Sequence, residues 1–303
     1  MSLTIVPFAE GEARLDWIGL TDAIAAGHAL PKAEIADTFL YRGKDTLLNR
    51  AAWIDGLGLA VKSATIFPGN AATNDPTVNG GVTLYRDSDG ALEALVDFHL
   101  VTKWKTAGDS LLAARKLARE DSRNILIIGA GTVARSLVQA YSAAFPEASF
   151  TVWNRTHANA LAFAASIPGM AVAENLEHAV KAADIITSAT MTTEPNLKGE
   201  WLQAGQHVDL IGAYRPDMRE VDDEALRRSR IFVDSFDTTV GHIGELKIPL
   251  AASVISRGDL VADYYDLSRF FRTADSDITL FKNGGGAHLD LMTARYILDR
   301  FRG

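Results

Sequence analysis

A glycine-rich turn near the middle of the chain carries the residue pattern with the clearest chemistry. It reads Gly129-Ala130-Gly131-Thr132-Val133-Ala134. The first glycine permits a tight turn, the second lets the backbone approach a pyrophosphate, and Ala134 lets the following helix pack closely on the preceding strand. The free N–H groups at the start of that helix attract phosphate oxygens. The spacing therefore predicts a binding site for the pyrophosphate of a dinucleotide.

The segments on either side of the turn are those that such a site requires. Residues 125–128 form an apolar run that reads as a buried strand, and residues 133–144 have the spacing of an amphipathic helix. The alternative is a tight strand-to-helix connection in an α/β protein that binds no nucleotide. The complete strand–turn–helix context favours the dinucleotide site.

The end of the next strand indicates which dinucleotide is bound. Sites for NAD place an Asp or Glu about 20 residues beyond the glycines, where it accepts hydrogen bonds from the ribose hydroxyls. This chain has Asn154, Arg155 and Thr156 there. Arginine offers a two-pronged hydrogen bond to a 2′-phosphate, which a carboxylate would repel. NADP(H) is therefore the preferred cofactor and NAD(H) the second choice, the alternative being that Arg155 is a solvated surface charge.

The elements that must position this turn alternate along the chain. Strands are expected at residues 125–128, 149–153, 171–172, 184–188, 207–211 and 230–233, and the helices between the first of them at 133–144, 158–166 and 176–182. Alternating strands and helices predict an α/β fold with a Rossmann doubly wound parallel sheet.

The residues before this region have a different pattern, which predicts a smaller α+β domain. Strands at 58–62, 81–86 and 94–98, separated by turn-rich segments, indicate an antiparallel meander. A helix expected at 107–120 leads into the Rossmann domain, and a helix expected at 290–301 returns to pack on the first domain. We expect residues 1–113 and 283–303 to form the smaller domain and residues 114–282 the Rossmann domain.

Composition excludes several classes of protein. A formal charge of −8 disfavours binding to nucleic acid, and the absence of cysteine excludes disulfides, thiolate metal sites and cysteine nucleophiles. No signal peptide or membrane-spanning run is apparent, so a cytoplasmic protein without a membrane partner is expected. His242 and Glu245 lie three residues apart, but no second histidine has useful spacing, so no metal site is expected.

Several motifs in unbroken order resemble the ornithine cyclodeaminase/mu-crystallin family. They span roughly residues 40–300, and ordered agreement of this kind is far more specific than one match. The motifs other than the glycine-rich turn are KSATIFPGN at 62–70, PT at 76–77, VTKWKTA at 101–107, WNRT at 153–156, GAYRPDMRE at 212–220 and FKNGG at 281–285.

The resemblance implies a Rossmann domain joined to a smaller domain that binds substrate and forms a homodimer. It implies a small amino- or imino-acid substrate, with Lys62, Thr77 and Lys105 as catalytic residues. It also implies that Lys62 and Lys105, with Arg42 or Arg50, hold the substrate carboxylate. Further cofactor contacts are expected from the segment Ser188-Ala189-Thr190 and from Gly212, Lys282 and Gly284, although the glycines at 284–286 could instead form a hinge between the domains.

Two departures from the family pattern bear on the reaction. Lys105 stands where most members have arginine, which keeps the charge but loses the two-pronged fork. Tyr214 stands where ornithine cyclodeaminases have an aspartate, and a phenol is a poor base at neutral pH.

These departures favour one of three functions. The first is an NADPH-dependent reductase of a ketimine or cyclic imine carboxylate such as pyrroline-2-carboxylate, in which Lys62 or a water protonates the nitrogen. The second is an ornithine cyclodeaminase, which uses NAD catalytically and releases ammonia and proline. The third is an NADPH-binding protein without catalytic activity.

Overall fold

The computed structural model describes residues 3–73 and 75–303. The chain forms two compact units, one of residues 1–105 and 286–303 and the other of residues 106–285. The chain passes from the first unit to the second within helix α3 (Phe98–Leu117) and returns after Gly285. None of the described helices combines the length and the apolar composition that a membrane span requires.

The first unit contains a six-stranded sheet in the order β1-β6-β5-β4-β3-β2. β1 pairs parallel with β6, and the other five strands form an antiparallel meander, of which the sequence predicted the last three strands. The strands are β1 (Thr4–Val6), β2 (Glu34–Arg42), β3 (Asp45–Ile54), β4 (Gly58–Ile66), β5 (Val78–Tyr85) and β6 (Leu92–Asp97). The short 3₁₀ helix η1 (Pro68–Thr73) joins β4 to β5.

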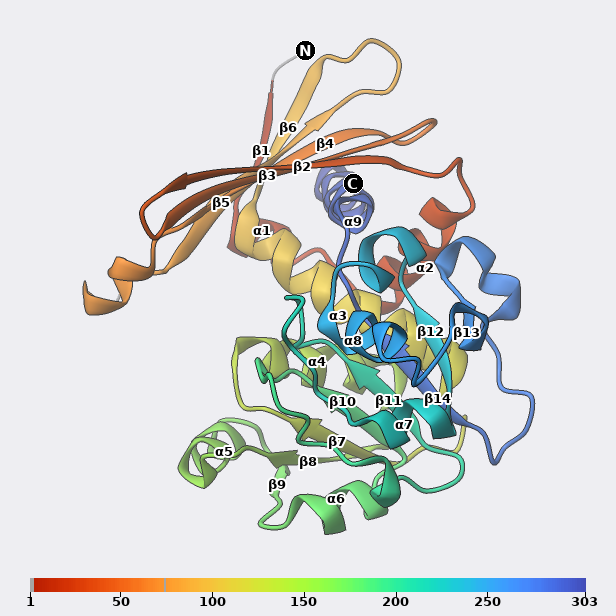
Figure 1. Cartoon of the computed structure of the whole chain (residues 1–303). Helices are drawn as coiled ribbons and strands as arrows, with labels where there is room; N and C mark the ends of the chain where they lie inside the picture. The colour runs from red at the N-terminus through yellow and green to blue at the C-terminus, as the bar shows by residue number, and fades with distance from the viewer. Residues whose placement is uncertain (1–2, 74) are drawn as a thin grey trace. The chain divides into compact units, whose positions relative to one another are not determined.

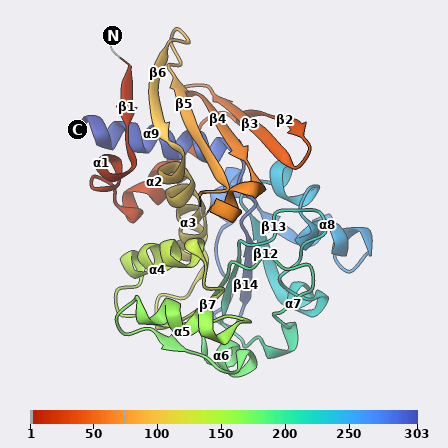
Figure 2. The same cartoon turned by 90° about the vertical axis from the view of Figure 1, so that its left-hand side faces the viewer.

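One face of this sheet is covered by the last helix of the chain. Helix α9 (Ala287–Arg302) packs on strands β3 and β4 and against helix α2 (Trp17–His28), while the short helix α1 (Phe8–Glu12) also contacts it. Figure 2 shows α9 running across the strands. Eleven residues of α9 are buried, so this helix forms much of the core of the unit. The return of the chain's last segment to the first domain was expected from its helical periodicity.

The second unit is a Rossmann-type layer structure, which confirms the predicted fold class. Its eight strands pair in parallel throughout, in the order β13-β12-β14-β11-β10-β7-β8-β9. They are β7 (Asn124–Ile128), β8 (Ser149–Trp153), β9 (Ala171–Val172), β10 (Ile185–Ser188), β11 (His207–Leu210), β12 (Ser229–Val233), β13 (Leu260–Ala262) and β14 (Ile278–Lys282). Figure 1 shows the strands side by side.

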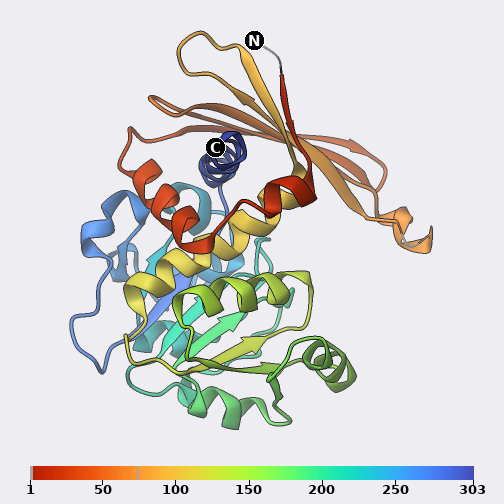
Figure 3. The ribbon, with the colours of Figure 1, turned by 180° about the vertical axis from the view of Figure 1, so that it is seen from behind.

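Helices lie on both faces of this sheet, as in other doubly wound folds. Figure 3 shows α4 in front of the parallel strands, while Figure 1 shows α6 at the lower edge. The helices are α4 (Thr132–Ala144), α5 (His157–Ala165), α6 (Leu176–Ala182), α7 (Asp223–Arg228) and α8 (Gly244–Ala251). Short helical turns complete the unit: η2 (Gly199–Trp201), η3 (Phe236–Val240), η4 (Arg257–Asp259) and η5 (Tyr264–Arg269).

Helix α3 begins nine residues before its predicted start. The sequence predicted a helix over 107–120, whereas the helix runs from Phe98 to Leu117. Its first turns contain Phe98, Val101 and Thr102, aromatic and β-branched residues that locally favour a strand. Phe98 and Val101 are buried, so packing decides the conformation of this segment over local preference.

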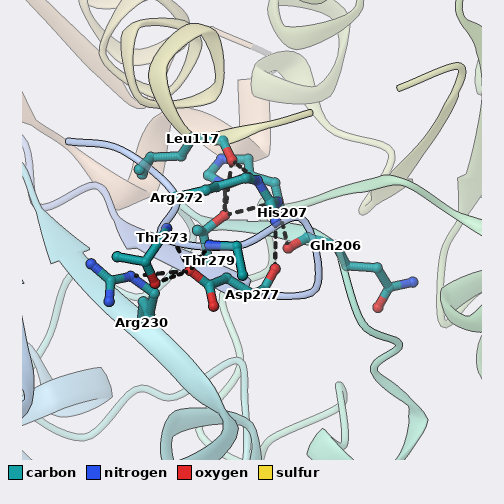
Figure 4. A network of polar contacts seen from close by, with 9 residues as sticks. Leu117, Gln206, His207, Arg230, Arg272, Thr273, Asp277 and Thr279 are labelled. Carbon is teal, nitrogen blue, oxygen red and sulfur yellow. Dashed lines mark hydrogen bonds and ion pairs between the residues drawn. The ribbon is translucent and has the colours of Figure 1, made fainter. Parts of the chain in front are cut away.

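A polar network around Arg272 links segments at the amino-terminal ends of the parallel strands (Figure 4). Its guanidinium donates to the carbonyl of Leu117 (2.5 Å) at the end of α3 and to that of Gln206 (3.0 Å) just before β11. It also donates to the carbonyl of Asp277, just before β14. One side chain therefore joins the end of α3 to the entrances of two neighbouring strands, at the edge of the sheet opposite the glycine-rich turn.

A buried carboxylate in the middle of the sheet predicts a pH-dependent stability. Asp209, on β11, is fully buried and accepts hydrogen bonds from Tyr141 Oη (3.1 Å) and Thr187 Oγ1 (2.9 Å). Burial raises the pKa of Asp209 to about 7. In the unfolded chain the carboxyl of Asp209 has a pKa of about 4. Between about pH 4 and about pH 7 the folded protein therefore keeps a proton on Asp209 that the unfolded chain has lost. The free energy of unfolding should fall as the pH rises through this range.

The expected slope from this one group is at most about 1.4 kcal/mol per pH unit. Asp209→Asn should therefore show a smaller decrease in unfolding free energy between about pH 5 and about pH 7 than the unchanged protein, measured by urea denaturation. Asp55→Asn, at an exposed turn, serves as the control and should leave the slope unchanged. Equal slopes for Asp209→Asn and the unchanged protein would contradict this account.

Candidate active site

The glycine-rich turn lies where the sequence predicted it, between strand β7 and helix α4. Gly129 has a φ of 111°, a conformation that favours glycine, and a Cβ there would lie 3.0 Å from the carbonyl oxygen of Ala189. Gly131 is the exposed N-cap of α4, no side chain caps this helix, and a Cβ at this position would meet open space. The free N–H groups of α4 and the open approach fit a bound diphosphate.

The turn also stands at the point where the order of the sheet reverses. From β7 the chain continues outward to β8 and β9, whereas β10 and β11 lie on the other side of β7. Ligands of open α/β sheets bind outside the carboxyl ends of the strands at such a point. Gly129 follows β7 and Ala189 follows β10, so both lie at this position.

The residues predicted to select the cofactor lie at the end of the neighbouring strand β8. Gly129 N donates to the carbonyl of Trp153 (2.8 Å), which joins the turn to the end of that strand. Asn154 is half-buried and donates to the carbonyl of Thr156 (2.9 Å), while Arg155 is exposed. Arg155 is therefore an exposed positive charge just after the strand that neighbours the glycine-rich turn.

Several other predicted cofactor residues have side chains that are already engaged within this unit. Ser188 is buried, and its hydroxyl donates to the carboxylate of Glu220 (2.6 Å), as does that of Thr190 (2.9 Å). The ammonium of Lys282 is fully buried and donates to two backbone carbonyls, of Leu210 and Asn283. Cofactor contacts at these three positions would therefore have to involve the backbone.

Gly284 and Gly212 are close-contact positions. A Cβ on Gly284 would lie 2.0 Å from Thr239 Oγ1, so the glycine is required by packing inside this unit. A Cβ on Gly212 would lie 2.1 Å from the carbonyl oxygen of Thr190, which keeps the loops after β10 and β11 in contact. Packing is a third explanation for Gly284, beside the hinge and the cofactor contact weighed from the sequence.

In the first unit, the structure brings together three of the predicted substrate residues. Lys62 on β4 and Arg50 on β3 are paired across the sheet, so their side chains share one face. Lys105, on helix α3, is also buried, and its charge acts on both Lys62 and Asp290. Lys62 Nζ lies 2.9 Å from Asp290 Oδ1 on α9 and 4.9 Å from the centre of the Phe98 ring.

Asp290 was not singled out by the sequence reasoning, although the motif before it was. It lies 228 residues from Lys62 along the chain and is almost completely buried. Its position in the first turn of α9 also places its negative charge at the positive end of the helix dipole. An acidic residue just inside a predicted helix after a glycine run is a weak signal, and only the fold shows that it faces Lys62.

The charges of this cluster suit an anionic substrate. Lys62, Lys105 and Arg50 are positive, while Asp290 and Asp37, which pairs with Arg50 (3.1 Å), are negative. One positive charge is therefore left for a carboxylate ligand. Within residues 3–73 and 75–303, Lys105 has no hydrogen-bonding or ion-pair partner, and a buried ammonium of this kind favours an anion.

Burial and neighbouring charges change the proton affinities in the cluster. Burial lowers the pKa of Lys62, and the nearby Lys105 lowers it further, while Asp290 acts in the opposite direction. Burial alone would raise the pKa of Asp290, but the charges of Lys62, Lys105 and Arg50 lower it, so this carboxyl is ionised. The pKa of Lys62 is thus lower than that of an exposed lysine, and its ammonium, which donates to Asp290, gives up its proton more readily.

Two predicted residues are not brought into the cluster. Arg42 pairs with Asp45 (2.9 Å) at the far end of the β2–β3 hairpin, and its side chain is 80% exposed. Asp45 and Arg50 are five positions apart on β3, which places them on opposite faces and roughly 17 Å apart. Thr77 lies just before β5 and accepts a hydrogen bond from Phe67 N through its carbonyl (2.8 Å).

Tyr214 occupies the loop after β11 and is 59% exposed. The nearby carboxylate of Asp217 is engaged in an ion pair with Arg215 (2.9 Å). The position where a cyclodeaminase would carry its aspartate therefore holds a phenol, as the sequence indicated.

Comparison with known proteins agrees with this geometry. A protein from Paracoccus denitrificans named Delta(1)-pyrroline-2-carboxylate reductase is 47% identical over 298 residues, covering 96% of this chain and 94% of that protein. The ketimine reductase mu-crystallin of Mus musculus is 33% identical and covers 80% of this chain and 75% of that protein. Delta(1)-pyrroline-2-carboxylate reductase of Thermococcus litoralis, solved with NADH and L-proline, superposes with a TM-score of 0.89 at 27% identity and covers 98% of this chain and 97% of that chain.

The sequence profile of the ornithine cyclodeaminase/mu-crystallin family matches residues 54–303, which include Lys62, Lys105 and Asp290 of the buried cluster and the glycine-rich turn. The match extends over most of the chain and confirms the resemblance found in the motifs. With its parallel sheet, its glycine-rich turn and its smaller antiparallel unit, this chain belongs to the ornithine cyclodeaminase/mu-crystallin family.

Proposed function

We propose that this protein is an NADPH-dependent reductase of a cyclic ketimine carboxylate, with pyrroline-2-carboxylate as the representative substrate. The observation that carries the proposal is the buried cluster of Lys62, Lys105 and Arg50 around Asp290, which has one positive charge left for a substrate carboxylate. The relatives that share most of this chain and reduce C=N bonds support the same reaction.

The proposed chemistry requires few groups from the protein. Bound reduced nicotinamide supplies the hydride that adds to the imine carbon. Lys105 and Arg50 hold the substrate carboxylate, which fixes the orientation of the C=N bond. Lys62 donates a proton to the nitrogen as the C–H bond forms, so the imine becomes a secondary amine with no other change. Asp290 keeps Lys62 in place and charged before this step.

The exposed guanidinium of Arg155 supports the preference for NADPH within this proposal. No carboxylate stands at positions 154–156 to accept hydrogen bonds from the ribose hydroxyls of NAD. The cofactor is therefore expected to be held by the N–H groups at the start of α4, with its 2′-phosphate beside Arg155.

We also propose that the enzyme is a homodimer formed through the sheet of the first unit. Strand β2 is at an edge of this sheet, and its side chains Phe39, Leu40 and Tyr41 are 48%, 59% and 73% exposed. Apolar side chains on an exposed edge strand favour association. Light scattering at micromolar concentration should give twice the mass of one chain, and Tyr41→Glu should lower it toward the monomer. If the unchanged protein has the mass of one chain, the proposed homodimer is wrong. A cytoplasmic location remains a prediction.

Steady-state assays test the proposed reaction. Purified protein should oxidise NADPH when pyrroline-2-carboxylate or a related cyclic imine acid is added, and should form the corresponding amino acid. L-ornithine with NAD should release no ammonia, because Tyr214 lacks the basicity that cyclodeamination needs. Ammonia and proline from ornithine would instead establish a cyclodeaminase, and tight NADPH binding without turnover on any imine would establish a binding protein.

A further inference from the structure

A buried glutamate in the second unit makes an unusually large number of hydrogen bonds. Glu220 lies in the loop after β11, and its side chain is completely buried. Its Oε1 accepts hydrogen bonds from Ser188 Oγ (2.6 Å), Thr190 N (2.8 Å) and Thr190 Oγ1 (2.9 Å). Its Oε2 accepts from Gly212 N (2.6 Å) and Ala213 N (3.2 Å). All five groups donate, so only a carboxylate satisfies this environment.

These donors belong to two loops at the carboxyl ends of neighbouring strands. Residues 188–190 end β10, and residues 212–213 follow β11. The loop after β10 lies beside the glycine-rich turn, because a Cβ on Gly129 would reach the carbonyl of Ala189. The loop after β11 contacts the loop after β10, because a Cβ on Gly212 would reach the carbonyl of Thr190. Glu220 therefore fixes the spacing of the two loops next to the proposed dinucleotide site.

A second buried carboxylate holds Glu220 in place. Glu245, near the start of α8, accepts hydrogen bonds from Glu220 N (2.8 Å) and Val221 N (3.1 Å). Burial and the neighbouring charge of Glu220 raise the pKa of Glu245 to about 7, against the opposing effect of Lys282. The backbone that carries Glu220 is thus anchored to a helix, and its side chain transmits that position to both loops.

The position of these loops indicates which half of the cofactor they face. In a doubly wound sheet the dinucleotide lies across the switch point, with its pyrophosphate at the glycine-rich turn. Arg155 and the end of β8 lie on the adenosine side of β7, whereas β10 and β11 lie on the other side. The loops fastened by Glu220 are therefore on the nicotinamide side.

We propose that Glu220 is the positioning residue for the nicotinamide half of the cofactor. It holds residues 188–190 and 212–213 in one arrangement, so that their backbone groups are already placed when the cofactor binds. The inference rests on the proposed function only in requiring that this unit binds a nicotinamide dinucleotide.

Binding of the whole cofactor and of its adenosine half separates this role from general stability. Glu220→Gln keeps the shape of the side chain but turns one acceptor into a donor facing N–H or O–H groups. It should weaken the binding of NADPH by about tenfold, on the scale of one lost charge-assisted hydrogen bond. Adenosine 2′,5′-bisphosphate, which lacks the nicotinamide half, should bind within about twofold of its affinity for the unchanged protein, because its contacts are made elsewhere.

Two further variants complete the test. Ser188→Ala removes one donor to Glu220 and leaves the carboxylate, so it should weaken NADPH in the same direction by a smaller factor. Glu174→Gln, an exposed carboxylate on the same unit, is the matched control and should change neither affinity. Fluorescence titration of NADPH and calorimetric titration of adenosine 2′,5′-bisphosphate provide the measurements.

The outcomes distinguish this inference from the proposed function. Selective loss of NADPH affinity supports the positioning role, even if the unchanged protein reduces none of the imines tested. Equal weakening of NADPH and of the bisphosphate, or no change in either, overturns the positioning role and leaves the reductase proposal standing. If the unchanged protein binds no reduced nicotinamide cofactor, both are wrong.

Discussion

Lys62→Met is expected to lower kcat/KM for pyrroline-2-carboxylate by at least about a hundredfold, which is the lower end of what a positioned proton donor contributes. Lys62 is the acid in the proposed reaction, and methionine has similar length without a proton to give. The loss should appear in kcat as well as in KM, because proton transfer belongs to the transition state. Lys116→Met, on the exposed surface of α3, should leave both constants unchanged.

Stability must be measured beside activity, because the same change leaves Asp290 without its partner. Removing one member of a buried ion pair typically costs about 3–5 kcal/mol. Lys62→Met combined with Asp290→Asn removes both charges and should recover much of that loss in urea denaturation, with no recovery of activity. If the double variant regains near-normal kcat/KM, Lys62 is a structural residue and not the proton donor.

Arg155→Glu should change cofactor preference more than any other substitution in the second unit. It removes the proposed partner of the 2′-phosphate and introduces a charge that repels it. The KM for NADPH should rise by about a hundredfold, which corresponds to about 2.7 kcal/mol, while the KM for NADH changes by less than about threefold.

Arg269→Glu makes the same change of charge at an exposed position of η5 and serves as the control. It should change the KM for NADPH and the KM for NADH by no more than about twofold, because a solvent-exposed charge away from the ligand is screened. If Arg155→Glu raises the KM for NADPH and the KM for NADH equally, Arg155 does not recognise the 2′-phosphate. The proposed preference for NADPH over NADH would then be unsupported.

Local patterns were sufficient to predict the parallel α/β sheet of the second unit and the position of its glycine-rich turn. The strand before Gly129 is an apolar run, and the helix after it has a clear amphipathic period. The turn between them needs a positive φ at position 129, which glycine adopts more readily than other residues. The resemblance implied roles for Lys62 and Lys105 because both lie inside its motifs, and the structure places both in one buried cluster. In each case the information lies within about ten neighbouring residues.

The remaining features depend on contacts between distant parts of the chain. Asp290 reaches Lys62 only because α9 returns to the first sheet, and Glu220 collects donors from two loops that follow different strands. The family resemblance implied Arg42 as a substrate residue, but the strand register turns it to the other face of the sheet. Sequence periodicity does not specify which residues pair across strands, so these positions could not be predicted.

The fate of the cofactor's hydrogen tests the central claim most directly. Protein incubated with pyrroline-2-carboxylate and NADPH that carries deuterium at both C4 positions should form proline with one deuterium on its α carbon, detected by mass spectrometry and NMR. Proline without that deuterium, or oxidation of the cofactor without proline, would contradict hydride transfer to the C=N bond.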